Sequence, residues 1–387
     1  MLSERTISLV KSTVPLLSDA GTAVTAHFYQ RMFSHNPELK NIFNMTNQHT
    51  GKQQFALFNA IAAYATHIDN PQVLQDAIGR INHKHVSLNI QAEHYDIVGH
   101  HLIETLKELA PEQFTPEIEQ AWREAYGFLA DLFITQEEGL YRTVEQQHGG
   151  WRNGREFVIA KLVQESENVK SFYLKPCDER AISHYQAGQF IAVSVTPSQS
   201  EHTQIRQYSL SQSPKHDHYR ISVKREGLVS TYLHQLAVGD TLTLYPPAGD
   251  FVLKNTTNDK VFVSAGVGIT PMMAMLEQAL TNETEARLSF IHACVDPSQH
   301  SFKQDIEQLA AQHSNVTKEV WYEHSEGSDK TGRIELQHSA LSLPYEHGEF
   351  YLCGPSAFMA AIKQQLLAQG VAPERILYEV FGPHESL

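Results

Sequence analysis

The sequence predicts a multidomain protein with an all-α segment, an antiparallel β-barrel and an α/β segment built on a parallel sheet. Two observations predict this organisation. The chain has 387 residues, which is too long for one compact hydrophobic core. The spacing of its apolar residues also changes twice, near residue 150 and near residue 260.

Residues 1 to 147 form the first predicted domain, and their pattern is helical throughout. Apolar residues recur three and four positions apart, and no alternating strand pattern is present. Breaks are expected at Pro37, at Pro71 and around Pro111. Thr115-Pro116 predicts a helix start, because a threonine hydroxyl can cap free amides and proline suits the first turn. That helix is expected to run to about Val144.

Residues 151 to 256 form the second predicted domain, after Gly149, Gly150 and Gly154. Five strand-like runs separated by turn residues favour a small antiparallel barrel. The runs cover residues 157–160, 189–195, 207–210, 219–223 and 241–245.

Residues 259 to 387 form the third predicted domain. Apolar runs at 261–265, 288–294 and 349–353 are separated by helical stretches near 271–281, 301–313 and 355–369. This alternation is typical of a parallel sheet covered by helices.

Composition narrows the class of protein. The net charge of -14 argues against a nucleic-acid or anionic-membrane partner. No apolar stretch is long enough for a membrane span, and the amino terminus lacks a secretory pattern. Three cysteines lie far apart without metal-ligand spacing, so free and mostly buried thiols in a reducing cytoplasm are expected.

Two glycine motifs in the third segment indicate a nicotinamide site. Gly266-Val267-Gly268-Ile269-Thr270-Pro271 stands between a strand and a helix, where glycines allow close approach to a phosphate. We expect Thr270 to cap this helix and Pro271 to be its first residue. Cys353-Gly354-Pro355 follows another strand, so both loops should lie at one sheet edge. The alternatives are an ordinary tight turn and a buried cysteine.

The second segment carries a possible flavin motif. Arg206-Gln207-Tyr208-Ser209 combines a phosphate partner, a flat aromatic ring and a hydroxyl within one strand. Gly227-Leu228-Val229-Ser230 then leads into a helix-like stretch, which could hold an anion. Taken alone, the first motif also fits an ordinary barrel strand.

The order of these motifs resembles the ferredoxin-reductase-like flavoprotein family from about residue 151 to 387. The resemblance implies that Arg206 and Ser230 bind the FAD pyrophosphate, Tyr208 stacks on the flavin, and Ser209 bonds near flavin N5. Near the end of Tyr378-Glu379-Val380-Phe381-Gly382-Pro383, Phe381 would cover the flavin until nicotinamide displaces it. The implied FAD contacts are Gln189, Phe190, Arg206, Gln207, Tyr208, Ser209, Gly227, Val229, Ser230, Glu379 and Phe381. The implied NAD(P)H contacts are Gly266, Gly268, Ile269, Thr270, Pro271, Cys353, Gly354 and Pro355.

The helical segment holds a candidate haem ligand. A CxxCH motif is absent, so a haem would be bound non-covalently through an imidazole. On a helix, His85 shares its face with Ile81 and Leu88, whereas His83 shares a largely polar face. We therefore expect His85 to be the buried histidine of the two. A core histidine bonded to a carbonyl is the alternative.

The whole chain resembles bacterial flavohaemoglobins, in which a globin precedes the FAD and NAD domains. The resemblance rests on the motifs His27-Phe28-Tyr29, 35–40, Ile42-Phe43-Asn44, Lys84-His85 and Ala125-Tyr126-Gly127. It implies a globin fold with haem b, His85 as proximal iron ligand and Lys84 near a propionate. It also implies roles around the haem for Tyr29, Phe43, Gln53, Leu57, Tyr95 and Glu137.

The resemblance implies a nitric oxide dioxygenase, in which NAD(P)H reduces FAD, FAD reduces the haem iron, and nitric oxide and O2 give nitrate. A flavin reductase serving other acceptors, peroxides among them, and a haem-based O2 or NO sensor are the alternatives. No arginine follows Cys294-Val295-Asp296 closely, which favours NADH over NADPH. A cytoplasmic monomer is expected.

Overall fold

The structure is a computed structural model that describes residues 2–45, 51–282, 285–324 and 327–382. The chain packs as two compact units. One contains Met1–Gln146, Trp151–Asn153 and Ser194–Arg206, and the other contains Gln147–Gly150, Gly154–Val193 and Gln207–Leu387. Among the described residues, no helix combines the length and the apolar character that a membrane crossing requires.

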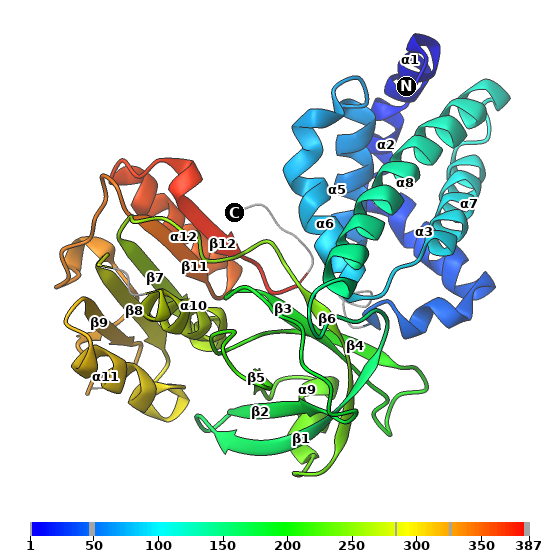
Figure 1. Cartoon of the computed structure of the whole chain (residues 1–387). Helices are drawn as coiled ribbons and strands as arrows, with labels where there is room; N and C mark the ends of the chain where they lie inside the picture. Colours follow the sequence, from blue (N-terminus) through cyan, green and yellow to red (C-terminus); the bar gives the residue numbers. More distant parts are fainter. Residues whose placement is uncertain (1, 46–50, 283–284, 325–326, 383–387) are drawn as a thin grey trace. The chain divides into compact units, whose positions relative to one another are not determined.

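Residues 4–145 of the first unit form helices, as their periodicity predicts (Figure 1). Pro37 and Pro71 each begin a short 3-10 turn, and the Thr115 hydroxyl caps the last helix by accepting from the Ile118 amide at 3.4 Å. The α-helices are α1 (Glu4–Ser12), α2 (Val14–Ala20), α3 (Thr22–His35), α5 (Lys52–Thr66), α6 (Gln75–Ser87), α7 (Ala92–Leu109) and α8 (Pro116–Glu145).

Two apolar clusters fill this helical unit. The larger one gathers side chains from α3, α5, α7 and α8 around the fully buried Trp122 and Phe28. The smaller one lies where α6, α7 and α8 meet, around Tyr95 and Phe133. The side chains that pack against both clusters, and so make the core continuous, are Ile42, Leu74, Tyr126 and Leu129.

A six-stranded sheet follows, with the strand order β4-β3-β6-β1-β2-β5. Its strands are β1 (Arg155–Gln164), β2 (Val169–Pro176), β3 (Phe190–Val195), β4 (Gln204–Ser209), β5 (Tyr219–Lys224) and β6 (Thr241–Ala248), with helix α9 (Leu228–Gln235) after β5. β1 pairs antiparallel with β2 and β6, and β2 pairs antiparallel with β5. The antiparallel prediction is confirmed.

The sequence did not predict β2. Its alternation is interrupted because Ser171 is fully buried where an apolar residue is expected. The serine is accommodated by a 2.7 Å hydrogen bond to the Ser222 hydroxyl on β5. A polar pair inside the barrel therefore hides the strand from a hydrophobicity pattern.

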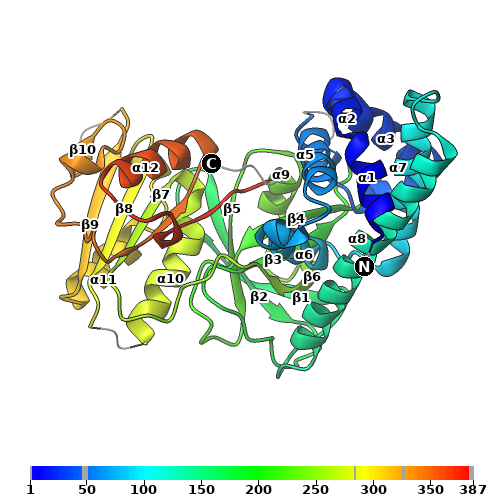
Figure 2. The same cartoon turned by 90° about the horizontal axis from the view of Figure 1, so that it is seen from above.

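The second sheet is parallel, with the order β10-β9-β8-β7-β11-β12. Its strands are β7 (Lys260–Ala265), β8 (Leu288–Cys294), β9 (Val316–Tyr322), β10 (Lys330–Thr331), β11 (Glu349–Cys353) and β12 (Ile376–Glu379). The helices α10 (Ile269–Thr281) and α11 (Lys303–Gln312) share a core on one face, and α12 (Ser356–Ala368) packs on the other (Figure 2). The predicted parallel sheet is confirmed, although β9, β10 and β12 were not expected.

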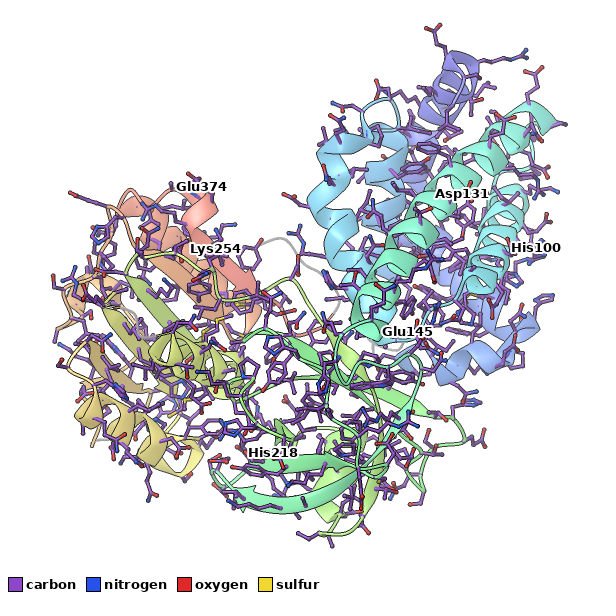
Figure 3. All side chains as sticks on the ribbon, viewed as in Figure 1. His100, Asp131, Glu145, His218, Lys254 and Glu374 are labelled. Carbon is purple, nitrogen blue, oxygen red and sulfur yellow. The ribbon has the colours of Figure 1, made fainter. Side chains whose placement is uncertain are left out.

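The segment between the two sheets is anchored to the second one. The Lys254 amide donates to the Tyr351 hydroxyl at 3.0 Å, and the Lys254 ammonium donates to the Glu374 carbonyl at 3.3 Å (Figure 3). All three cysteines are free. Cys294 and Cys353 are buried as expected, whereas Cys177 is exposed.

Candidate functional site

His85 on α6 is held by two residues from neighbouring helices. Its Nδ1 atom lies 2.8 Å from Oε1 of Glu137 on α8 and 2.9 Å from the hydroxyl of Tyr95 on α7. The Tyr95 hydroxyl donates to the same Glu137 oxygen at 2.6 Å. Glu137 is buried, with 2% of its surface exposed. Three side chains from three helices therefore form one closed hydrogen-bonded group.

The protons in this group can be assigned. Burial, followed by the Glu137 charge, raises the pKa of Tyr95, so the phenol stays protonated and donates to the carboxylate. The remaining contact requires a proton on Nδ1 of His85, which then donates to Glu137. The lone pair of a neutral imidazole is thereby left on Nε2.

The arrangement of His85, Tyr95 and Glu137 is suited to a histidine that binds haem iron. Nε2 of His85 has no hydrogen-bond partner in the described part of the chain. A ligating imidazole needs this lone pair free and its other nitrogen bonded to a carboxylate or similar group. The expectation that His85 is buried was too strong, because its side chain is 33% exposed. Only its Nδ1 edge is tied into the helical core.

Tyr29 and Phe43, both expected at the haem, lie close together. Tyr29 on α3 is 4% exposed, and its ring centroid lies 5.8 Å from that of Phe43, with the two rings nearly perpendicular. The ring centroid of Phe33 lies 5.7 Å from that of Tyr29 and 5.6 Å from that of Phe43. Leu57 on α5 packs against the same apolar cluster. Tyr29 thus places a phenol among apolar side chains.

Three other residues of this segment have less defined surroundings. Gln53 and Lys84 are both half-buried, on α5 and α6. The hydroxyl of Tyr64, which also lies on α5, donates to the Ala125 carbonyl at 2.7 Å. This hydroxyl therefore ties α5 to α8.

The flavin motif lies on β4. Arg206, Gln207 and Tyr208 are half-buried and Ser209 is buried. The Arg206 guanidinium donates to the Ile205 carbonyl at 2.8 Å and to Oε1 of Gln204 at 3.1 Å. The motif remains a candidate FAD contact with three partly accessible side chains.

Two neighbouring candidates use their side chains within the barrel. Gln189 donates to the Gly249 carbonyl at 3.0 Å and accepts from the Gln186 amide at 2.9 Å. Phe190 is 6% exposed. The Gln189 backbone is also paired, since its amide donates to the Gln186 carbonyl at 3.0 Å and its carbonyl accepts from the Leu210 amide at 2.9 Å.

The loop before α9 is ordered by Ser230. Its hydroxyl accepts from the amides of Glu226 and Gly227, each at 2.9 Å, and donates to the Gly227 carbonyl at 3.1 Å. Gly227 precedes the first residue of α9, and Val229 is buried beneath it. Ser230 therefore shapes the loop that was expected to hold a pyrophosphate.

The two glycine loops of the second sheet meet at one edge, as predicted. Cys353 at the end of β11 is in register with Ser264 of β7, and a Cβ atom on Gly268 would lie 2.3 Å from the Cys353 carbonyl oxygen. Gly266 has a φ of +54° and Gly354 a φ of +158°, so both occupy backbone regions that favour glycine. Burial raises the pKa of the Cys353 thiol, which stays neutral.

One prediction at this loop was wrong. α10 begins at Ile269 with Gly268 as its N-cap residue, so Thr270 is not the cap and Pro271 is not the first helical residue. The Thr270 hydroxyl donates to the Val267 carbonyl at 3.0 Å. The physical reason is the short 3-10 turn Gly266–Gly268, which continues directly into the helix, so that the helix begins earlier in the sequence than expected.

Strand β12 lies beside the Cys353 loop. Glu379, the last residue of β12, is paired in register with Cys353. Phe381 is 46% exposed, which is unusual for a phenylalanine. Pro383, the last residue of the motif that contains Phe381, lies outside the described residues.

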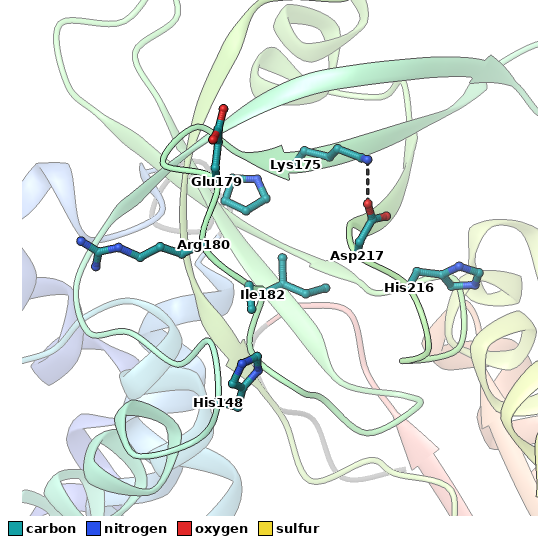
Figure 4. A pocket seen from close by; sticks show the side chains of 9 residues that line it. His148, Lys175, Glu179, Arg180, Ile182, His216 and Asp217 are labelled. Atoms are coloured by element: carbon teal, nitrogen blue, oxygen red, sulfur yellow. Dashed lines mark hydrogen bonds and ion pairs between the residues drawn. The ribbon is translucent and has the colours of Figure 1, made fainter.

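A cavity of about 450 Å³ is lined by residues that belong to none of these motifs (Figure 4). Its lining includes His148, Lys175, Arg180 and His216, none of which was expected to be functional. Lys175 is already paired with Asp217 at 2.7 Å. The cavity therefore adds no residue to the candidate site.

Comparison with known proteins identifies the three parts of the chain. The globin family model matches residues 26–132, the oxidoreductase FAD-binding domain matches residues 156–253, and the oxidoreductase NAD-binding domain matches residues 262–364.

Curated relatives and solved structures cover the whole chain. Flavohemoproteins of Vibrio cholerae and Bacillus subtilis are 52% and 43% identical, over 100% of this chain and 100% and 99% of theirs. A flavohemoglobin of Malassezia yamatoensis with bound FAD and heme is 27% identical with a TM-score of 0.90, covering 98% of this chain and all of that one. The FAD/NAD-binding domain of a Vibrio cholerae nitric oxide dioxygenase is 45% identical with a TM-score of 0.57, covering 60% of this chain and all of that one. The chain therefore belongs to the flavohemoprotein family, as an oxidoreductase with globin, FAD-binding and NAD-binding domains.

Proposed function

We propose that this protein is a nitric oxide dioxygenase that uses NADH and O2 to convert nitric oxide to nitrate. The observation that carries the proposal is the His85–Tyr95–Glu137 group, which prepares an imidazole for an iron on the same chain as a nicotinamide and flavin module. The name of the Vibrio cholerae structure, a nitric oxide dioxygenase, supports this substrate.

The cofactors supply the redox chemistry when they are bound, since FAD accepts electrons in pairs and releases them singly toward an iron. His85 would hold the iron through Nε2. Glu137 and Tyr95 fix the ring orientation and keep a proton on Nδ1. A carboxylate accepting from that proton raises the basicity of the imidazole, which makes it a stronger electron donor.

Tyr29 would act as a hydrogen-bond donor at the haem. A buried phenol among Phe28, Phe33 and Phe43 is a neutral donor in surroundings of low polarity. Such a donor stabilises negative charge that develops during a reaction more strongly than water does. Phe43 and Leu57 would shape the space beside it and exclude water.

In the reductase half, residues of the two domains have separate tasks. Arg206 and the Ser230 loop would hold the FAD pyrophosphate, Tyr208 would cover the flavin and Ser209 would bond near its N5. The Gly266–Thr270 loop and Gly354 would receive the nicotinamide dinucleotide, with Phe381 covering the flavin before it arrives.

NADH is the proposed donor. Asp296 follows β8, at the sheet edge where an acidic residue suits a ribose 2′-hydroxyl and repels a 2′-phosphate. Its carboxylate accepts from the Ser298 amide at 2.8 Å and from the Ser298 hydroxyl at 2.6 Å, which lowers its pKa. A negative charge is thereby maintained at this position. A lower KM for NADPH than for NADH would contradict this choice.

We also infer a cytoplasmic monomer. Three free cysteines suit a reducing compartment. Light scattering after gel filtration tests the monomer, and fractionation of the native host tests the location.

Rapid mixing without oxygen tests the function. The purified protein should carry an intense Soret band, and NADH should change the flavin bands before the haem bands. Subsequent addition of O2 and nitric oxide should consume both gases in equal amounts and form nitrate. A yellow protein lacking the Soret band would instead be a flavin reductase, and a haem protein that binds nitric oxide without forming nitrate would be a sensor.

A further inference from the structure

A partly buried ion pair joins the FAD-binding domain to the NAD-binding domain. Nη2 of Arg220 on β5 lies 3.3 Å from Oε1 of Glu277 on α10. The two side chains are 9% and 23% exposed. Opposite charges held this far from solvent interact more strongly than a surface pair does.

Further contacts fix the orientation of both partners. The other Glu277 oxygen accepts from the Ser213 amide at 2.7 Å. Nε of Arg220 donates to the Ser211 hydroxyl at 3.1 Å, and Nη2 also donates to the Ser211 carbonyl. The guanidinium carbon lies 5.1 Å from the centre of the Phe302 ring, which precedes α11. The pair is therefore a directional contact with little freedom to slide.

The two partners lie on the elements that carry the predicted cofactor loops. β5, which contains Arg220, leads into the Gly227–Ser230 loop before α9. α10, which contains Glu277, begins directly after the Gly266–Gly268 turn. A shift at the ion pair would thus move one cofactor loop relative to the other.

α10 also contacts the barrel through apolar side chains. Gly188 lies against the Met275 side chain, since a Cβ atom on this glycine would approach the Met275 methyl carbon to 2.4 Å. Ala187 and Phe251 belong to the same apolar cluster as Met275. Apolar contacts hold the domains together without direction, whereas a partly buried, hydrogen-bonded charge pair favours one arrangement.

We propose that Arg220 and Glu277 are positioning residues for hydride transfer, because their ion pair sets the orientation of the NAD-binding domain on the FAD-binding domain. The proposal rests on the proposed function, in which NADH reduces FAD. A misplacement of about 1 Å between reacting groups can slow a reaction by roughly a hundredfold. The dissociation constant for NADH should change little, because neither Arg220 nor Glu277 belongs to the loops expected to bind the dinucleotide.

The first test measures the rate of flavin reduction by NADH, by rapid mixing in the absence of oxygen. Arg220→Met should lower the limiting rate per bound FAD by about tenfold or more, with a less than roughly threefold change in the NADH dissociation constant. Glu277→Gln should have a smaller effect, because an amide oxygen can still accept from the Ser213 amide. This nearly isosteric variant also keeps the test valid if Arg220→Met does not fold.

Hydrogen exchange of the cofactor-free protein is the second test. The Glu167 amide donates to the Ser298 carbonyl at 2.8 Å, a bond between the same two domains made by other segments. Exchange at this amide should become faster in Arg220→Met if the pair orients the domains. A purely local structural role would leave it unchanged.

Lys175→Met is the matched control. It removes an ion pair of 2.7 Å with Asp217 that lies within the FAD-binding domain and is largely exposed (Figure 4). It should alter neither flavin reduction nor the exchange of the Glu167 amide.

Wild-type flavin reduction rates in both variants would overturn the proposal, and so would a slower rate without faster exchange at Glu167. Failure of the proposed function is distinguishable, because flavin reduction does not involve nitric oxide. A wild-type protein that reduces its flavin but forms no nitrate would contradict only the proposed function.

Discussion

The carboxylate of Glu137 lies 2.8 Å from Nδ1 of His85, across the contact between α8 and α6. Because Tyr95 donates to the same oxygen at 2.6 Å, the carboxylate is held in place and cannot rotate away from the imidazole. The electronic character of His85 is therefore set by a buried negative charge two helices away in sequence.

Glu137→Gln should weaken the influence of this carboxylate on the His85 imidazole. An amide oxygen accepts the Nδ1 proton less strongly than a carboxylate, so the imidazole becomes a poorer donor, and nitric oxide turnover should fall by about 10- to 100-fold. Flavin reduction by NADH should be unchanged. Glu138→Gln is the control, since Glu138 pairs with Arg142 and Arg152, away from His85. Equal losses in both variants would refute the assigned role.

Tyr29→Phe should remove a hydrogen-bond donor without changing the packing. Loss of one donor to developing charge costs about 10²- to 10³-fold in turnover. The nitric oxide consumption rate should fall accordingly, with flavin reduction intact. Tyr64→Phe serves as the comparison, because its hydroxyl is already used by the Ala125 carbonyl. It should affect stability and leave turnover near the wild-type value.

The sequence predicts most of the fold because its signals are local. Helix α8 is expected from Thr115-Pro116 and its periodicity, and it ends at Glu145, close to the predicted Val144. Strand β2 escapes prediction because Ser171 is buried by a partner on β5 that no local pattern reveals. Thr270 is misassigned for a related reason, since a 3-10 turn before α10 is not visible in the motif.

Only part of the candidate site could be predicted from the sequence. The helical face of His85 distinguishes it from His83, but its partners lie 10 and 52 positions away and were expected only by resemblance. Arg220 and Glu277, 57 positions apart, carried no signal at all. Contacts between distant segments depend on how helices and sheets pack, which spacing along one element does not determine.

Stability should fall through His101 as the pH drops from about 6.5 toward 4. Its Nδ1 accepts from Arg31 at 2.5 Å and its Nε2 donates to Asn36 at 2.9 Å, an arrangement that requires the neutral ring. Burial, followed by the charge of Arg31, lowers the pKa of His101 from 6.5 to about 4. Between these values the unfolded chain binds a proton that the folded protein does not, so acid favours unfolding.

Urea unfolding at several pH values measures this effect. His101→Gln can keep both hydrogen bonds without titrating, so its stability should fall less than that of the wild type as the pH drops below 6.5. His100→Gln changes an exposed neighbour on α7 and should retain the wild-type slope (Figure 3). Parallel slopes for the wild type and His101→Gln would contradict the assignment.

Gly268→Ala should separate the two loops that meet at the edge of the parallel sheet. Gly268 has a φ of -60°, which alanine adopts readily, so backbone strain is not the issue. The added Cβ would lie 2.3 Å from the Cys353 carbonyl oxygen and 2.7 Å from the Gly354 nitrogen. Because both are backbone atoms, one loop must move, at a cost of about 1–3 kcal/mol in unfolding free energy. Flavin reduction by NADH should slow by about tenfold or more, since the displaced loops are those expected to receive the nicotinamide.

Gly370→Ala separates this effect from a general loss of stability. Gly370 follows α12 with a φ of +81° and has open space around it, so alanine there costs about 1 kcal/mol through backbone strain alone. The two variants should therefore have comparable stability and different rates of flavin reduction. If Gly370→Ala slowed flavin reduction as much as Gly268→Ala, the contact between Gly268 and Cys353 would have no specific part in nicotinamide binding. Normal flavin reduction in Gly268→Ala would mean that the Cys353 loop can withdraw without disturbing the bound dinucleotide.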